Sequence, residues 1–82
     1  MMGYDDAFVY PNPFRDRLSI VVNRNSSVPQ VIVSVVDATG KQLLRQSFAT
    51  NTTLNLEHLA TGVYIVQVND GVSVKSFKVY KQ

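Results

Sequence analysis

The stretch VIVSVVDATGKQLLRQSF at residues 31–48 decides the fold of this chain. Valine and isoleucine fill most of residues 31–36, and such β-branched side chains favour β-strands. In the DATG segment that follows, Asp37 can accept a hydrogen bond from the backbone two residues on. Gly40 can adopt a positive φ angle without a Cβ clash. The stretch therefore predicts two antiparallel strands, joined by a type I turn that closes through a glycine bulge.

Short apolar-rich runs of this kind recur along the whole chain and are separated by turn signals. None of them keeps the i, i+3, i+4 spacing of an amphipathic helix for long. We therefore predict an all-β fold, an antiparallel Ig-like or Greek-key β-sandwich of about seven strands. The predicted strands are residues 7–10, 17–22, 31–37, 41–48, 52–57, 63–69 and 72–80.

Alternation along each strand predicts which side chains face the core, because successive side chains point to opposite faces. Val31, Val33 and Val35 share one face, while Ile32 and Val36 make the other face apolar too. This strand is therefore expected to be central in its sheet or covered on both sides. The other residues predicted to point inward are Leu18, Ile20, Val22, Leu54, Leu56, Leu59, Tyr64, Val66, Val68, Phe77 and Val79.

Two further segments interrupt the strand pattern. The Asn-Asp-Gly sequence at 69–71 predicts a second hairpin, in which the Asp-Gly pair supplies the positive φ values. The YPNPF segment at 10–14 contains two prolines, which have no N–H to give to a ladder, so it predicts a kinked edge segment or corner. Phe8 and Phe14 are expected to anchor this corner on either side. The corner should also protect an edge from unwanted strand pairing.

The composition describes one small domain, which we place at residues 7–82 after a tail or linker end at 1–6. The net charge is only +2 and the basic residues are spread from Arg15 to Lys81, so nucleic acid is not an expected partner. The absence of cysteine excludes disulfides and thiolate metal sites. No signal peptide is evident, so an export signal, if there is one, must lie outside this sequence.

The residues that carry catalysis or bind cofactors form no pattern in this sequence. His58 is the single histidine and is expected to be solvated in a polar loop. Asp5 and Asp6 lack the spacing of a calcium loop, and the four glycines are isolated rather than gathered in a phosphate loop. We predict no catalytic residues, no cofactor, no metal and no enzymatic activity. Lys75, Lys78 and Lys81 are interpreted as solvated charges.

Four segments, taken in order, resemble the motifs of the type IX secretion C-terminal sorting domains of Bacteroidetes. The YPNPF segment followed by Leu18-Ser19-Ile20 resembles the opening motif. The second motif is matched by VSVVDATG at 33–40, an apolar strand that ends in Asp-x-x-Gly. The third is matched by Leu54-Asn55-Leu56 and then LATGVYIV at 59–66, although Thr61 stands where many relatives have another small residue. FKVYKQ at 77–82 resembles the closing strand.

The resemblance implies a delivery label rather than a catalyst. A translocon in the outer membrane would recognise the folded label and pass an N-terminally attached cargo from the periplasm to the cell surface. A gingipain-like signal peptidase would usually remove the label. The candidate recognition residues that carry over are Pro11, Asn12, Pro13, Gly40, Gly62, Tyr64, Lys78, Val79, Tyr80, Lys81 and Gln82.

Each candidate recognition residue also has a purely structural interpretation. The prolines shape a corner, the glycines satisfy turn dihedral angles, and Tyr64 fills the core. For the terminal strand both interpretations stay open, because an edge strand can be recognised by strand addition.

The sequence is also compatible with two other functions. The chain can be a carbohydrate- or protein-binding β-sandwich module of an extracellular enzyme or adhesin, with Tyr4, Tyr10 and Tyr80 as candidate aromatic platform. It can also be a structural or adhesive domain that pairs with copies of itself. A homodimer formed by edge pairing or strand swapping is compatible with a sorting label as well.

Overall fold

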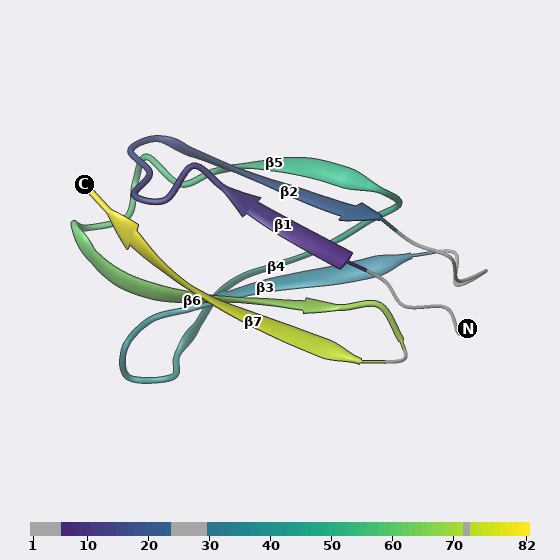
Figure 1. Cartoon of the computed structure of the whole chain (residues 1–82). Helices are drawn as coiled ribbons and strands as arrows, with labels where there is room; N and C mark the ends of the chain where they lie inside the picture. Colours follow the sequence, from purple (N-terminus) through teal and green to yellow (C-terminus); the bar gives the residue numbers. More distant parts are fainter. Residues whose placement is uncertain (1–5, 24–29, 72) are drawn as a thin grey trace.

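The computed structural model describes residues 6–23, 30–71 and 73–82; the tail predicted ahead of Asp6, with Tyr4 and Asp5, lies outside them. The described residues form seven strands in two antiparallel sheets (Figure 1). This confirms the predicted all-β sandwich. The strands are β1 (Asp6–Tyr10), β2 (Arg17–Asn23), β3 (Val31–Val36), β4 (Gln42–Phe48), β5 (Asn51–Asn55), β6 (Gly62–Asn69) and β7 (Val74–Lys81).

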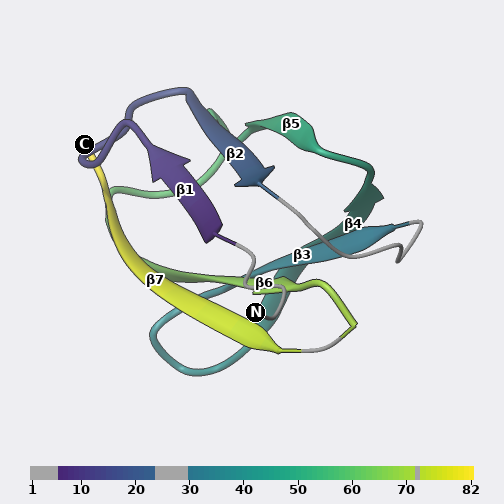
Figure 2. The same cartoon turned by 45° about the vertical axis from the view of Figure 1, so that its right-hand side comes forward.

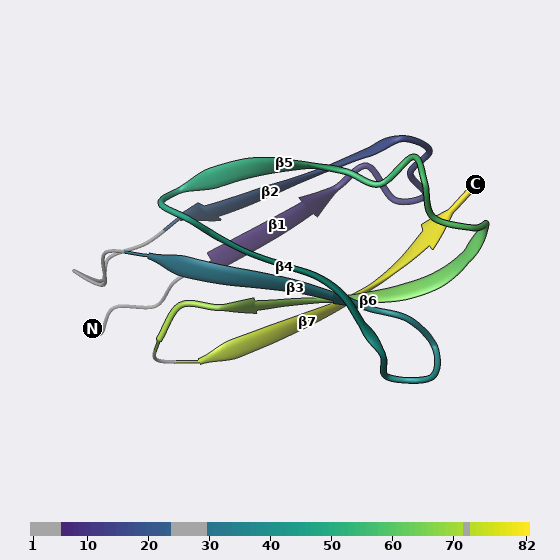
Figure 3. The same cartoon turned by 180° about the vertical axis from the view of Figure 1, so that it is seen from behind.

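The sandwich has a three-stranded sheet, in the order β1-β2-β5, and a four-stranded sheet, in the order β4-β3-β6-β7. The edge strands β1 and β7 lie on one side of the molecule (Figure 2). Seen from behind, the chain rises from β4 in one sheet to β5 in the other (Figure 3). Within the described residues, no helix is long and apolar enough to cross a membrane.

The core lies between the sheets and follows the predicted alternation. Leu18, Ile20 and Val33 are fully buried, and burial of each such side chain stabilises the fold by about 1.5–3 kcal/mol. β3 is central, as predicted, and its outward-facing Ile32 and Val36 are half-buried between neighbouring strands. The buried apolar residues are Phe14, Leu18, Ile20, Val22, Val31, Val33, Val35, Phe48, Leu54, Leu56, Tyr64, Val66, Val68 and Val79, with Leu59 and Phe77 packed against them.

The turn between β3 and β4 has the geometry that the sequence predicted. The Gly40 N–H donates to the Asp37 carbonyl at 3.0 Å, and Gly40 has a φ of 89°. One carboxylate oxygen of Asp37 accepts bonds from the Thr39 N–H at 2.9 Å, the Thr39 hydroxyl at 2.6 Å and the Lys41 N–H at 3.0 Å. The strand register shifts beyond Val35, as a bulge requires.

The turn after β6 differs from its prediction. Gly71 has a φ of 92°, but no residue other than glycine has a positive φ among those described, so Asp70 does not share this conformation. The Asp70 N–H donates to the Ser73 carbonyl at 3.2 Å, and the Asp70 carboxylate accepts the Ser73 N–H at 2.9 Å. These bonds close a longer loop, and β7 begins only at Val74. Val72, which began the predicted strand, lies outside the described residues.

Two expectations about side-chain placement were wrong. Phe8 does not anchor the proline corner, because alternation in β1 turns it outward, where it is 53% exposed. Lys81 is not solvated but only 8% exposed, and Lys75 is half-buried. Alternation places both lysines on the inward face of β7, with Phe77 between them. Inward-pointing lysines on an edge strand discourage pairing with another chain.

Replacement of Gly40 by alanine should destabilise the domain by about 1–2 kcal/mol, because an L side chain is disfavoured at positive φ. An added Cβ would meet no atom within 4 Å, so the backbone conformation is the whole cause. Gly40→Asn should cost less, since asparagine tolerates this region better. Chemical denaturation of the three proteins measures the difference, and equal midpoints would contradict the assigned turn.

Asp37 should make the stability of the domain depend on acidic pH. The Thr39 hydroxyl, followed by the Lys41 N–H, lowers the pKa of Asp37 below its ordinary value of 3.8. A carboxyl whose pKa is lower in the folded than in the unfolded state stabilises above the unfolded pKa, and this contribution is lost as the pH falls through the folded pKa. Carboxyl NMR titration should find the lowered pKa, and Thr39→Ala should raise it towards 3.8. A titration at or above that value in the parent protein would refute the assignment.

Candidate functional site

The proline corner carries the chain from one sheet to the other and back. After β1, residues 11–14 run along the outer edge of β7, in the opposite sheet, and Phe14 forms an isolated parallel bridge with Lys81. The Phe14 N–H donates to the Tyr80 carbonyl at 2.8 Å, and the Gln82 N–H donates to the Phe14 carbonyl at 2.8 Å. The ring of Phe14 is fully buried. The predicted corner is therefore confirmed, with cis peptide bonds before both of its prolines.

Asn12 extends this pairing with its side chain. Its Nδ2 donates to the Lys78 carbonyl at 3.1 Å, and its Oδ1 accepts the Tyr80 N–H at 3.0 Å. Pro11 and Pro13 have no N–H to offer a neighbouring strand, whereas a carboxamide supplies both a donor and an acceptor. The side chain thus takes the place of a backbone peptide group. We call these two bonds, with the two backbone bonds of Phe14, the Asn12 clamp.

Gly62 and Tyr64 lie on the other side of the same part of β7. In the register of β6 and β7, Gly62 is opposite Lys81 and Tyr64 is opposite Val79. The Tyr64 hydroxyl donates to the Ala60 carbonyl at 2.6 Å, which holds the connection from β5 against the start of β6. A tyrosine that bonds back to the preceding connection in this way is known in Ig-like sandwiches as a tyrosine corner.

The candidate residues divide into exposed and buried sets. Tyr64, Val79 and Lys81 are buried, so their side chains shape this end of the sandwich from beneath. Lys78 Nζ lies 5.9 Å from the centroid of the Tyr80 ring, and Tyr80 is 46% exposed. The exposed candidates gathered around the Asn12 clamp are Pro11, Asn12, Pro13, Lys78, Tyr80 and Gln82.

Gly40 is not brought to this group. It lies in the turn between β3 and β4, and β6 separates these two strands from β7 in the sheet. In this structure Gly40 adopts the positive φ angle that the turn requires.

The Asn12 clamp also limits how β7 can be recognised. Between Lys78 and Gln82 the outer edge of this strand already has partners, so a second chain cannot add there while the clamp is closed. Strand addition, which the sequence left open for residues 78–82, therefore requires the clamp to release.

Sequence reasoning identified the two halves of this site but not the bond between them. The signal that was available is an amide side chain placed between two residues that lack an N–H. Other chemistry is not apparent: in residues 6–23, 30–71 and 73–82, no three acidic, histidine or cysteine side chains are grouped to hold a metal ion. His58 is exposed in its loop, as predicted.

The family model described as the secretion system C-terminal sorting domain matches residues 8–82. The match includes both sides of the Asn12 clamp. No curated protein matches the chain significantly. Domains of this kind are sorting signals of exported proteins, and the family is not one of enzymes. Because the match covers nearly the whole chain, we conclude that this chain belongs to the family of type IX secretion C-terminal sorting domains.

Proposed function

We propose that this domain is the label by which a type IX translocon in the outer membrane carries an N-terminally attached cargo from the periplasm to the cell surface. A gingipain-like peptidase then removes the label. The observation that supports this proposal is the Asn12 clamp, because it assembles the opening and closing motifs of the family into one exposed surface.

The recognition surface that we propose consists of the exposed residues around the clamp. Asn12 bonds to residues that lie 66 and 68 positions further along the sequence, so this surface forms only when the first corner and the last strand have both folded. A translocon that binds it therefore distinguishes a folded label from an unfolded one. Gly62, Tyr64, Val79 and Lys81 contribute from beneath, by holding β6 against β7.

The placement of this surface suits a label with cargo attached. β1 begins at the end of the sandwich opposite to Gln82 and the Asn12 clamp (Figure 1). Cargo joined ahead of β1 therefore leaves the proposed recognition surface uncovered. The same arrangement puts the joining segment, where the peptidase would cut, away from the translocon.

Fusion of residues 1–82 to a periplasmic reporter should bring the reporter to the surface of a type IX-competent bacterium. Surface labelling of intact cells and cell fractionation measure the result. A reporter that stays in the periplasm, although its label is folded, would contradict the proposed function.

Asn12→Ala should strongly reduce this export. The substitution removes two hydrogen bonds, each worth about 1 kcal/mol, and leaves the Lys78 carbonyl and the Tyr80 N–H of β7 without these partners. Gln46→Ala is a matched control, because Gln46 Nε2 donates to the Thr52 hydroxyl at 2.8 Å between β4 and β5, on the opposite side of the sandwich. Export of the fused reporter is compared after both isolated variants are shown to be folded. Equal export of the two variants would contradict a role of the clamp in recognition.

A further inference from the structure

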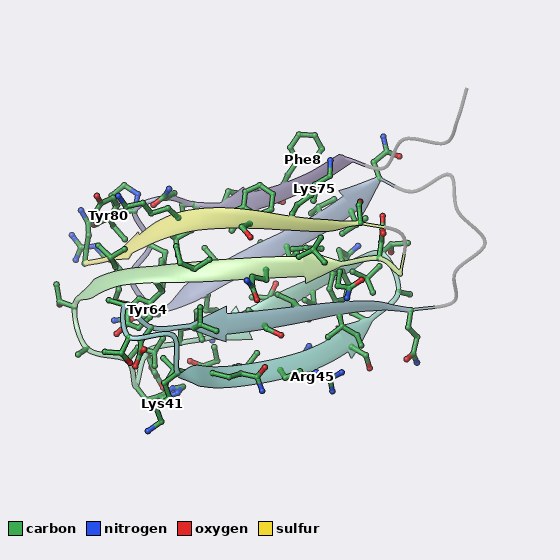
Figure 4. The ribbon with its side chains drawn as sticks, turned by 90° about the horizontal axis from the view of Figure 1, so that it is seen from below. Phe8, Lys41, Arg45, Tyr64, Lys75 and Tyr80 are labelled. Atoms are coloured by element: carbon green, nitrogen blue, oxygen red, sulfur yellow. The ribbon has the colours of Figure 1, made fainter. Side chains whose placement is uncertain are left out.

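The outer face of the three-stranded sheet carries aromatic side chains that the sorting function does not use. Phe8 and Tyr10 are 53% and 52% exposed. They are two residues apart in β1, so both rings lie on the same face, about 7 Å apart along the strand. The Phe8 ring is directed away from the sandwich (Figure 4). Aromatic rings gathered at the surface in this way commonly mark a binding site.

The strand register gives the composition of the remainder of this face. Beside Phe8 lie Val21 and then Asn51; beside Tyr10 lie Ser19 and then Thr53. The next row contains Arg17 and Asn55. The face therefore has two aromatic rings along β1, followed by hydroxyl, carboxamide and guanidinium groups on β2 and β5. We call these eight residues the aromatic face.

The polar groups of the aromatic face are available to a ligand. Within the described part of the chain, the side chains of Arg17, Ser19, Asn51 and Thr53 form no hydrogen bond or ion pair. The side-chain oxygen of Asn55 accepts a hydrogen bond from the Glu57 N–H at 3.2 Å. No carboxylate side chain belongs to these three rows. The face thus offers neutral hydrogen-bonding groups and a single positive charge.

This combination of groups matches a sugar chain. The face of a sugar ring presents C–H groups, which are attracted to the electron-rich face of an aromatic ring. Its hydroxyl groups pair with carboxamides and hydroxyls, which both donate and accept hydrogen bonds. A guanidinium pairs with a carboxylate, and some sugars carry one. We infer that the aromatic face binds an oligosaccharide, with Phe8 and Tyr10 stacked on sugar rings and Arg17 placed to bind a uronic acid.

A protein partner fits the aromatic face less well. Protein interfaces are built around buried apolar or arginine anchors in well-packed pockets. Here the apolar part consists of two rings at one edge and the half-buried Val21. Of the aromatic residues that the sequence suggested for a sugar platform, Tyr10 belongs to this face, Tyr80 belongs to the other sheet, and Tyr4 lies outside the described residues.

The experiment begins with a broad glycan array of the full chain, followed by NMR titration with a neutral cello-oligosaccharide and an acidic oligogalacturonate. Backbone amide shifts should be confined to β1, β2 and β5. Phe8→Ala and Tyr10→Ala should each weaken binding by about three- to tenfold. Tyr80→Ala is the matched control, since this equally accessible ring lies on the other sheet and should leave the affinity unchanged. Arg17→Gln should weaken binding of oligogalacturonate only.

Three results would overturn the inference: no binding to any glycan of the array, an equal loss of affinity in Tyr80→Ala, or self-association that shifts the same amides in the absence of sugar. Light scattering over a range of protein concentrations identifies the third. The reporter fusion separates this inference from the proposed function, because Phe8→Ala, which lies outside the YPNPF motif, should leave export unchanged.

Discussion

The C-terminal part of β7 has an outer edge whose peptide groups need hydrogen-bond partners, and the Asn12 clamp provides them. An unpaired edge strand exposes a row of peptide groups to any other chain. The corner cannot cover that edge with a regular strand, since two of its residues have no N–H. A carboxamide solves this problem because it bonds to β7 as a peptide group would. The buried ring of Phe14 then fixes the corner to the core.

This arrangement separates the candidate residues by their physical roles. Tyr64 and Val79 hold β6 and β7 together from the inside, and the hydroxyl of Tyr64 fixes the preceding connection. The exposed side chains of Asn12, Lys78 and Tyr80 project from this part of the sandwich. The aromatic face belongs to the other sheet, so the two proposed binding surfaces do not share a side chain.

Local chemistry explains which features could be predicted from the sequence. The strands and their inward faces follow from alternation, and the turn at Asp37 and Gly40 follows from two residues and their neighbours. The clamp could not be predicted in this way, because nothing near Asn12 shows that its partner lies at the other end of the chain. Phe8 does not anchor the corner because its neighbours Ala7 and Val9 pack against the core, so alternation along β1 turns Phe8 outward.

The order of β1 and the Asn12 clamp along the chain has a mechanical consequence. β1 pairs with β2 alone, and the clamp follows it in the sequence. Tension applied to the chain ahead of Asp6 would therefore peel β1 away first, and the load would reach Asn12 only afterwards. β1 is thus a sacrificial strand: it can detach under a pull from the N-terminal side while the Asn12 clamp between the corner and β7 stays closed.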